Sequence, residues 1–237
     1  MIDSCRIAVV VPAKNEERFV GTVVRTLPSF VDVPIVVDDG SDDDTSGVAR
    51  RASDRVVVIR HPRSRGVGGA IVAGYRRALD DGADVVAVMA GDGQMDPAEL
   101  GDVVGPVVAG QAGYVKGNRL RHPDVWRVMP WHRLVGTAVL GTLTARATGL
   151  ALSDSQCGYT AIGRDALERI DLDGLWTGYG YPNDLLGALA RARVSVREVT
   201  VRPVYGEEHS GLRARHVGTI LWLLGRAARM RFVTSGS

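Results

Sequence analysis

Cysteine is scarce in the 237-residue sequence, and long apolar runs are missing from it. The two cysteines, Cys5 and Cys157, lie far apart and have no neighbours at metal-ligand spacing, which argues against a disulfide framework and a zinc site. No segment reaches the roughly 20 apolar residues that a transmembrane helix needs. The apolar run Ile7–Val11 is too short for a signal peptide. We therefore expect reduced thiols and a cytoplasmic protein, with peripheral membrane contact as an added role.

An excess of charge of one sign is also lacking. The 29 Lys and Arg residues nearly balance the 27 Asp and Glu residues, and the net charge is +2. This balance argues against a dedicated nucleic-acid binder, which would carry a concentrated basic face, but it leaves room for a local pocket that holds phosphates. Apolar residues make up 45% of the chain, and we find no repeats. The composition predicts a single domain over residues 1–237, with unequal halves of about 1–115 and about 116–237.

Short apolar runs rich in β-branched residues alternate with helical segments in the first half. Continuous apolar runs of this length are typical of strands that are buried on both faces of a parallel sheet. Their spacing of about 25 residues indicates βαβ units. We predict an α/β fold with a doubly wound, mostly parallel sheet and helices on both faces. The expected strands are Ile7–Val11, Ile35–Val37, Val56–Ile59 and Val85–Met89, and the expected helices are Asn15–Thr26, Asp43–Ser53 and Gly68–Asp81.

A further helix is predicted after Asp96, which suits an N-cap and is followed by Pro97 at the first helical position. Pro106 should kink that helix. The second half is less regular, with helices expected over Trp131–Ala147 and residues 213–232 and a strand in "VSVREVTVRPV". Aromatic side chains of this kind usually pack, and isolated histidines without metal spacing are usually structural or exposed. This expectation applies to Trp126, Trp131, Trp176, Trp222, His61, His122, His132 and His216.

Polar and glycine-rich segments follow each of the first four expected strands: "PAKNEE", "DDGSDDDT", "RHPRSRGVGGA" and "AGDGQMDP". In an open parallel sheet, ligands bind beyond the carboxyl ends of the strands. These segments predict a cleft with acids on one side and arginines and backbone N–H groups on the other. "RGVGGA", which contains Gly68, resembles a phosphate-cradling loop. The first strand end lacks the glycines of a dinucleotide fingerprint, and GKS or GKT is absent, so an NAD-dependent oxidoreductase is the least favoured function.

Two carboxylate positions stand out at these strand ends. Asp38 and Asp39 either cap a turn together with Ser41 or contact a base and ribose. Asp92, between two glycines, is either a turn residue or a ligand of Mg²⁺ or Mn²⁺. Such cations often take one or two protein carboxylates and complete their shell with diphosphate oxygens and water. Gln94 would add a carbonyl oxygen to that shell.

The chain resembles the inverting glycosyltransferases of family 2, and within them the dolichyl-phosphate mannose synthase branch, also called polyprenyl-phosphate glycosyltransferases. The ordered motifs that carry this resemblance are "VVVPAKNEE", "IVVDDGSDDDT", "RGVGGAIVAGYRRAL", "GDGQMDP", "KGNR", "SDSQCGYTAI", "YPNDLL" and "YGEEHSG", which together cover about residues 6–220. The resemblance implies the GT-A fold, a nucleotide-activated sugar with a divalent metal, and transfer of the sugar to a lipid phosphate. The first half would then bind the nucleotide sugar and the second half the acceptor.

The resemblance also implies roles for individual residues. Asp92 and Gln94 would hold the metal. Arg119, Arg133 and Thr137 would hold the acceptor phosphate, and both arginines and Asp92 would act in catalysis. Asp154 and Asp184, in segments that would border the sugar, would be the candidate bases if the acceptor were a hydroxyl group. The nucleotide sugar would meet Pro12, Ala13, Glu16, Asp38, Asp39, Gly68 and Asp92, and His209, Ser210 and Arg213 would close over it.

Two residues depart from the family pattern. Ala90 stands where the first acid of Asp-x-Asp is usual. The site would then bind the metal more weakly, use Gln94 and water more heavily, or have lost its metal dependence. Lys14 replaces the usual aromatic residue beside the base. Lys14 could instead meet a phosphate. Whether the base of the donor is guanine or uracil therefore stays open.

The predicted function is inverting transfer of mannose or glucose from a GDP- or UDP-sugar to a polyprenyl or dolichyl phosphate, with Mg²⁺ or Mn²⁺. A phosphate acceptor is already anionic, so the protein mainly has to position two phosphates and offset their repulsion. The alternatives are transfer to a soluble small-molecule acceptor and, because of Ala90, a weakened or non-catalytic nucleotide-sugar binder. The basic, apolar-faced helix over residues 213–232 either packs on the core or also lies on an anionic membrane.

Overall fold

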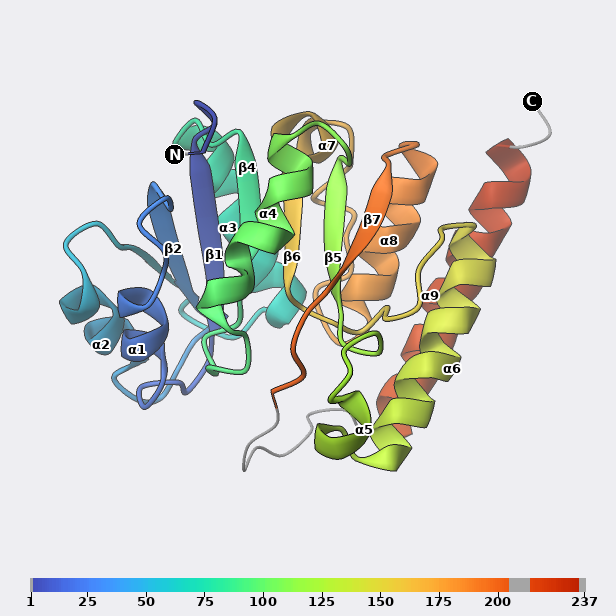
Figure 1. The fold of residues 1–237 in the computed structure, drawn as a ribbon, viewed down its shortest axis with the longest axis horizontal. Helices are drawn as coiled ribbons and strands as arrows, with labels where there is room; N and C mark the ends of the chain where they lie inside the picture. Colours follow the sequence, from blue (N-terminus) through green and yellow to red (C-terminus); the bar gives the residue numbers. More distant parts are fainter. Residues whose placement is uncertain (1, 205–213, 235–237) are drawn as a thin grey trace.

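The protein is built on a seven-stranded mixed sheet with the strand order β3-β2-β1-β4-β6-β5-β7 (Figure 1). The computed structural model describes residues 2–204 and 214–234, without the side chains of 214–217 and 230–234. The strands are β1 Ile7–Ala13, β2 Val33–Asp38, β3 Val57–Arg60, β4 Val85–Val88, β5 Tyr114–Asn118, β6 Thr160–Gly163 and β7 Val196–Thr200.

Strand β6 runs antiparallel to both of its neighbours, β4 and β5, whereas the β1–β2, β1–β4, β2–β3 and β5–β7 pairs are parallel. The prediction of a mostly parallel sheet is therefore confirmed. Two successive antiparallel pairings leave β5 running in the same direction as β4. The carboxyl ends of β1, β2, β4 and β5 consequently lie at one edge of the sheet, where a ligand site is expected.

Helices cover both faces of the sheet, as the sequence predicts. Successive residues of β1 alternate between the two cores: Val10 packs with α3 and α8, and Val9 and Val11 pack with α1, α2 and α4. Gly74 of α3 lies so close to β1 that an added Cβ would stand 2.3 Å from Val10. The helices are α1 Val20–Arg25, α2 Thr45–Ala52, α3 Val67–Asp80, α4 Leu100–Val108, α5 Val125–Val128, α6 Trp131–Thr148, α7 Arg164–Glu168, α8 Tyr181–Arg191 and α9 Ala214–Thr234, with a 3₁₀ turn η1 at Pro97–Glu99.

Helix α1 begins at Val20, so the predicted start at Asn15 is wrong. Asn15 has φ 57°, which is outside the helical region. Its backbone N–H donates to the Ser41 hydroxyl at 2.9 Å, and the N–H of Glu16 donates to the Thr45 hydroxyl at 2.8 Å. These bonds tie the segment after β1 to the segment after β2 and hold Asn15 in its non-helical conformation.

The predicted helix start after Asp96 is confirmed. The Asp96 carboxylate accepts a hydrogen bond from the N–H of Ala98 at 2.9 Å and caps η1, which leads into α4. Pro106 lies in the last turn of α4, and the helix ends two residues later at Val108. The proline therefore falls where few intrahelical bonds remain for it to break.

Helices α6 and α9 pack against each other beyond β7 (Figure 1). On α9, Ile220, Leu223 and Leu224 are buried, so this helix packs on the core. Within residues 2–204 and 214–234 no helix meets the length and hydrophobicity that a membrane crossing needs. The prediction that Trp126 and Trp131 pack is wrong, because they are 78% and 76% exposed at α5 and the start of α6.

Candidate functional site

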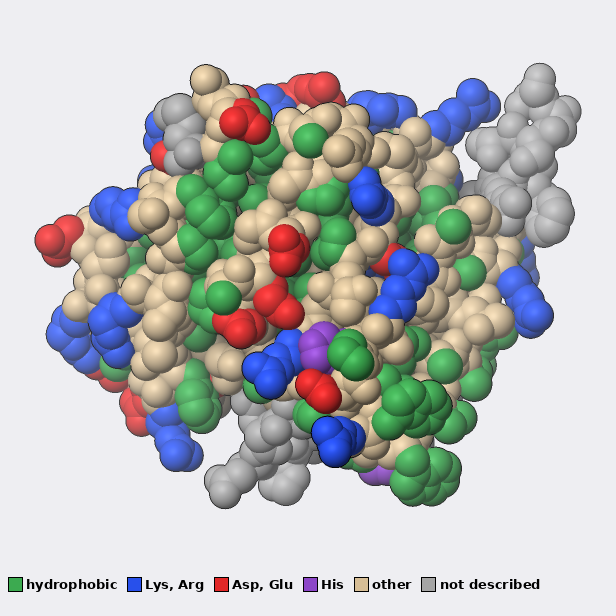
Figure 2. Space-filling view, in the orientation of Figure 1, with side chains coloured by type: hydrophobic (Ala, Val, Ile, Leu, Met, Phe, Trp, Pro, Cys, Tyr) green, Lys and Arg blue, Asp and Glu red, His purple; other side chains and the backbone are tan. Residues whose placement is uncertain are grey.

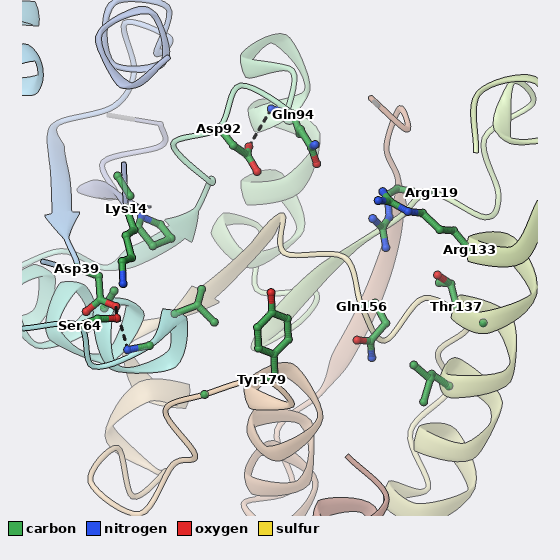
Figure 3. Close-up of a pocket in the computed structure, with 18 of the residues that line it drawn as sticks. Lys14, Asp39, Ser64, Asp92, Gln94, Arg119, Arg133, Thr137, Gln156 and Tyr179 are labelled. Atoms are coloured by element: carbon green, nitrogen blue, oxygen red, sulfur yellow. Dashed lines mark hydrogen bonds between the residues drawn. The ribbon is translucent and has the colours of Figure 1, made fainter. Parts of the chain in front are cut away.

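A cavity of about 900 Å³ lies beyond the carboxyl ends of β1, β2 and β4 and is closed on its far side by α6 (Figure 3). Backbone hydrogen bonds hold its floor. The N–H of Asp39 donates to the carbonyl oxygen of Ala13 at 2.9 Å, and the N–H of Gly91 donates to the carbonyl oxygen of Pro12 at 3.1 Å. The predicted residues that line this cavity are Pro12, Ala13, Asp39, Asp92, Gln94, Arg119, Arg133 and Thr137.

Asp92 points into the cavity from the turn after β4 (Figure 3). One of its oxygens accepts the N–H of Gln94 at 3.0 Å, and this is the only hydrogen bond that Asp92 receives from another residue in the described part of the chain. Burial raises the pKa of Asp92, and the bond from Gln94 only partly offsets this effect. A desolvated carboxylate with a free oxygen is a suitable ligand for a cation.

The rest of an all-protein metal shell is not found around Asp92. No group of three or more His, Cys, Asp or Glu side chains gathers in the described part of the chain. Ala90, two residues earlier, contributes only its backbone N–H, which contacts the Met95 sulfur at 3.3 Å. Asp92 and the neighbouring Gln94 thus fit a cation whose remaining ligands come from a diphosphate and water, the arrangement that Mg²⁺ commonly uses.

Asp38 lies outside the cavity lining and is fully buried. Its carboxylate accepts hydrogen bonds from the Ser41 N–H at 2.8 Å and the Ser46 hydroxyl at 2.5 Å. Burial alone would raise the pKa of Asp38, but these bonds outweigh it and lower the pKa. Of the two interpretations that the sequence allowed, the geometry at Asp38 is that of a capped turn.

Asp39 lines the cavity, and its carboxylate organises the loop that leads into α3. It receives hydrogen bonds from the Ser64 hydroxyl at 2.6 Å, from the N–H groups of Arg65 and Gly66 at 2.8 and 2.9 Å, and from Nδ1 of His61 at 2.8 Å. Burial would raise the pKa of Asp39, but these bonds together lower it. Asp39 therefore fixes the shape of the cavity wall through this loop.

Gly66 and Gly68 of the glycine-rich segment have different surroundings. Gly66 lines the cavity with φ 84°, and an added Cβ would meet the Thr177 carbonyl at 2.5 Å. Gly68 lies outside the lining, and its N–H donates to that same carbonyl at 2.8 Å. An added Cβ on Gly68 would meet the Trp176 carbonyl at 2.5 Å. The structure thus places Gly68 at a close approach of α3 to the 176–178 segment, and its N–H is already used.

Arg119, just after β5, forms a bidentate ion pair with Asp154. Its Nε and Nη2 lie 2.9 and 3.0 Å from the two Asp154 oxygens, and its N–H donates to the same carboxylate at 3.2 Å. Asp154 is fully buried and outside the cavity lining. Burial would raise the pKa of Asp154, but the positive charge of Arg119 and the hydrogen bonds lower it. In this arrangement Asp154 orients Arg119 toward the cavity rather than facing the cavity itself.

Glu198 on β7 forms a second buried carboxylate centre behind this pair. It accepts hydrogen bonds from the N–H groups of Ser153 and Asp154 at 2.8 and 2.9 Å and from the Asn118 side chain at 2.8 Å. Glu198 thereby fixes the turn that carries Asp154. This residue was not predicted from the sequence. Its one signal was a charged residue within the alternating strand pattern of "VSVREVTV".

Helix α6 supplies the opposite wall with Arg133, Thr137 and Leu140. Figure 3 shows Arg119 and Arg133 pointing into the cavity from the side away from Lys14 and Asp39. Two guanidinium groups therefore share a cavity with the Asp92 carboxylate. Such a cavity is suited to two anionic groups, one held near Asp92 through a cation and one held by the arginines.

Asp184 lies outside the cavity lining and is buried, although the resemblance implies a catalytic role for it. Its carboxylate accepts the Trp176 N–H at 2.8 Å and pairs with Arg226 of α9. Glu16 also lies outside the lining. His209, Ser210 and Arg213 lie outside the described residues.

Several lining residues were not singled out from the sequence. Ser64 and Gly66 lie in the "RHPRSRGVGGA" segment, Gln156 lies in "SDSQCGY", and Tyr179 lies in "GLWTGYGYP". The first two segments appear among the motifs of the sequence analysis, but their patterns did not say which residue would face the cavity. Lys14 was noted as a departure from the family, and it does line the cavity (Figure 3).

Comparison with known proteins shows the family of this chain. The sequence model described as glycosyl transferase family 2 matches residues 8–171, and the chain belongs to this family. It is 34% identical over 205 residues to a polyprenol monophosphomannose synthase of Mycolicibacterium smegmatis, covering 83% of this chain and 76% of the relative. It is 29% identical over 217 residues to a UDP-N-acetylglucosamine–dolichyl-phosphate N-acetylglucosaminyltransferase of Methanococcus voltae, covering 85% and 86%. The protein is therefore a glycosyltransferase.

Solved structures show the same fold. A glucosyl-3-phosphoglycerate synthase of Mycobacterium tuberculosis superposes with a TM-score of 0.70 at 24% identity and covers 94% of this chain and 81% of its own. The same synthase was crystallised with Mn²⁺, UDP and glucosyl-3-phosphoglycerate, and that structure also has a TM-score of 0.70, at 21% identity, covering 95% of this chain and 80% of its own. The fold of the chain is accordingly GT-A.

Proposed function

We propose that this glycosyltransferase moves a hexose, mannose or glucose, from a GDP- or UDP-sugar to a polyprenyl phosphate with inversion at the anomeric carbon. The observation that carries the proposal is the sharing of one cavity by Asp92 and Gln94 on one side and Arg119, Arg133 and Thr137 on the other. Relatives named as polyprenol and undecaprenyl phosphate mannosyl transferases support the acceptor class.

The donor would be held by a divalent cation. Asp92 and Gln94 are the residues that would bind Mg²⁺ or Mn²⁺, and the cation would offset the charge of the leaving diphosphate. The raised pKa of Asp92 fits this role, because a cation would supply the charge that stabilises the partly buried carboxylate.

The acceptor phosphate would need little help from a base. Its oxygen is already anionic near neutral pH, and it would attack the anomeric carbon in line as the bond from that carbon to the diphosphate breaks. Arg119 and Arg133 would reduce the repulsion between the two phosphates. The environments of Asp154 and Asp184 support this mechanism, because both carboxylates are engaged in ion pairs outside the cavity lining.

A transfer assay tests the proposal. Purified protein is mixed with GDP-mannose or UDP-glucose and Mn²⁺ or Mg²⁺, and the acceptor is a polyprenyl phosphate, the matching polyprenol without phosphate, or a soluble phosphorylated acceptor such as 3-phosphoglycerate. We expect a product with inverted anomeric configuration from the polyprenyl phosphate alone. Transfer only to the soluble acceptor would contradict the proposed lipid substrate and favour the alternative, a transferase that acts on a soluble small molecule.

A weakened catalyst or a nucleotide-sugar binder is the second candidate, and Ala90 favours it. Restoring the missing acid with Ala90→Asp should raise the affinity for Mn²⁺ and increase turnover if the protein is a metal-limited transferase. Isothermal titration with Mn²⁺ and the transfer assay measure both effects. Tight donor binding without transfer, in both the native protein and the variant, would identify a binder instead.

A further inference from the structure

Lysine and arginine side chains are usually exposed, as those in Figure 2 are, but Lys116 of β5 is fully buried. Its side chain lies on the same face of the strand as those of Tyr114 and Asn118, because alternate residues of a strand share a face. The proposed mechanism does not use it. Taking an ammonium group out of water is costly unless nearby groups bind it. We therefore expect Lys116 to bind a group that an apolar side chain of the same size could not bind.

The Lys116 ammonium group binds a backbone carbonyl where the pairing of two strands ends. Antiparallel pairing between β5 and β6 continues up to Gly117, whose N–H donates across to the segment before β6 at 2.8 Å. In this register the next bond would join the N–H of Arg119 to the carbonyl oxygen of Cys157. The N–H of Arg119 donates to Asp154 instead, at 3.2 Å. Nζ of Lys116 donates to the Cys157 carbonyl oxygen at 2.6 Å and so replaces the missing backbone bond.

The 154–157 turn, which ends at this carbonyl, carries two groups that shape the cavity. The Asp154 carboxylate accepts the N–H of Gln156 at 3.1 Å and the N–H of Cys157 at 3.0 Å. The same carboxylate holds Arg119 in its bidentate pair, and Gln156 lines the cavity. A shift of the Cys157 carbonyl would therefore displace both the carboxylate that orients Arg119 and the side chain of Gln156.

The charge of Lys116 acts on the same group of residues. Burial lowers the pKa of Lys116, and the negative charges of Asp154 and Glu198 oppose this effect. Burial would raise the pKa of Asp154, and the positive charges of Arg119 and Lys116 are among the causes that lower it. An ammonium group at this position therefore helps to keep Asp154 ionised, and an ionised carboxylate is what a bidentate pair with Arg119 requires.

We propose that Lys116 is a positioning residue for the transfer reaction: its ammonium group fixes the 154–157 turn, and this turn places Arg119 and Gln156 in the cavity. The inference rests on the proposed function, in which Arg119 meets the acceptor phosphate. Lys116 itself lies outside the cavity lining and touches no substrate. Its removal should therefore slow transfer without weakening the binding of the nucleotide sugar.

Two substitutions at Lys116 test the assignment in the transfer assay. Lys116→Met keeps the length of the side chain and removes its donor and charge, whereas Lys116→Gln keeps a hydrogen-bond donor without the charge. We expect turnover to fall about tenfold or more in Lys116→Met, because a small misplacement of a positioned group is enough for such a loss. The loss should be smaller in Lys116→Gln. In both variants the KM for the nucleotide sugar and the rise in Tm that it produces should stay unchanged.

The matched control is Tyr114→Phe. It alters another fully buried side chain on the same face of β5 and should change turnover little. A purely structural role for Lys116 would lower the Tm of the free protein and leave the turnover of the folded variant at the native value. Native turnover in Lys116→Met, or an equal loss in Tyr114→Phe, would overturn the inference. Lys116→Gln provides the same comparison if Lys116→Met does not fold.

A double-mutant cycle and a crystal structure separate this inference from the proposed function. Losses of turnover in Lys116→Met and Arg119→Ala should be non-additive, because Lys116 acts through Arg119. The crystal structure of Lys116→Met should show the Arg119–Asp154 pair displaced or broken. Additive losses or an unmoved pair would overturn the inference. Absence of transfer in the native protein would instead contradict the proposed function, and the crystal structure would still decide whether Lys116 positions Arg119.

Discussion

The two sides of the cavity are held by different forces. On the donor side, the paired backbones of β1, β2 and β4 position the lining residues. The Asp39 carboxylate accepts hydrogen bonds from the loop that leads into α3. On the acceptor side, Arg119 follows β5 and is oriented by a buried ion pair, and Arg133 projects from a helix with an exposed apolar face. Substitutions on the acceptor side should therefore lower turnover most, and those on the donor side should mainly lower the affinity for the donor.

The largest effect is expected at Arg119. Arg119→Ala should lower turnover by about 10²–10³, because it removes a preorganised positive charge from the reacting phosphates. The rise in Tm with donor should change little, since the donor-side residues are untouched. Steady-state transfer kinetics measure the loss. Arg51→Ala, which removes an exposed guanidinium paired with Asp44, is the control and should be neutral. Equal turnover in both variants would remove Arg119 from the mechanism.

Asp154 and Asp184 are the two candidate bases, and comparing them tests whether Asp154 acts by orienting Arg119 instead. Asp154→Asn should lower turnover about tenfold or more by releasing Arg119, and it should cost about 3–5 kcal/mol of stability as the buried pair is broken. Asp184→Asn breaks the pair with Arg226 and should lower stability while turnover stays within about threefold.

Urea unfolding and transfer kinetics of the two variants separate these effects. A double-mutant cycle of Arg119 and Asp154 should be strongly non-additive, because the two side chains act as one unit. If Asp184→Asn abolished transfer in a folded protein, the carboxylate would have a catalytic role that its position does not explain.

Gly66 tests the donor side. Gly66→Ala places a Cβ against the Thr177 carbonyl in a backbone with φ 84° and should cost about 1–3 kcal/mol with weaker donor binding. Gly110→Ala is the matched control: its φ is 67°, but nothing lies within 4 Å of an added Cβ, so only the backbone strain remains, about 1–2 kcal/mol. Calorimetry with and without donor measures both. Unchanged donor affinity in Gly66→Ala would separate this loop from the donor site.

The smallest effect is expected from the pH dependence of Asp38. Hydrogen bonds lower the pKa of Asp38 in the folded state. Its stabilising contribution is therefore present above the unfolded pKa of about 3.9 and is lost as the pH falls through the folded value. Asp38→Asn should cost about 1–3 kcal/mol at pH 7, and its difference from the native protein should shrink below about pH 4. Urea unfolding across this pH range measures the difference, and a difference that stays constant with pH would show that the ionised carboxylate is not its source.

The sequence predicted the strands of the first half because short, continuous runs of β-branched apolar residues are typical of strands buried on both faces of a sheet. It missed the start of α1, because the left-handed conformation at Asn15 depends on hydrogen bonds to a loop that is 26 residues away. It could not choose between Asp38 and Asp39, since adjacent residues at a strand end differ only in the direction of their side chains.

Long-range contacts explain the remaining errors. The role of Glu198 depends on β7 lying beside β5, and no local pattern reports that pairing. Trp126 and Trp131 were expected to pack because large aromatic side chains usually do. Their exposure follows from the position of α5 and the start of α6 at the lower edge of the molecule in Figure 1, which the sequence did not specify.

The central claim is that Asp92 and the two cavity arginines bring a donor diphosphate and an acceptor phosphate together. Crystals soaked with Mn²⁺ and a nucleotide sugar test it most directly through the anomalous scattering of manganese. The account predicts a manganese peak within coordination distance of the Asp92 carboxylate, with the diphosphate bound to that manganese inside the cavity. A peak elsewhere, with the diphosphate bound away from Asp92, would contradict it.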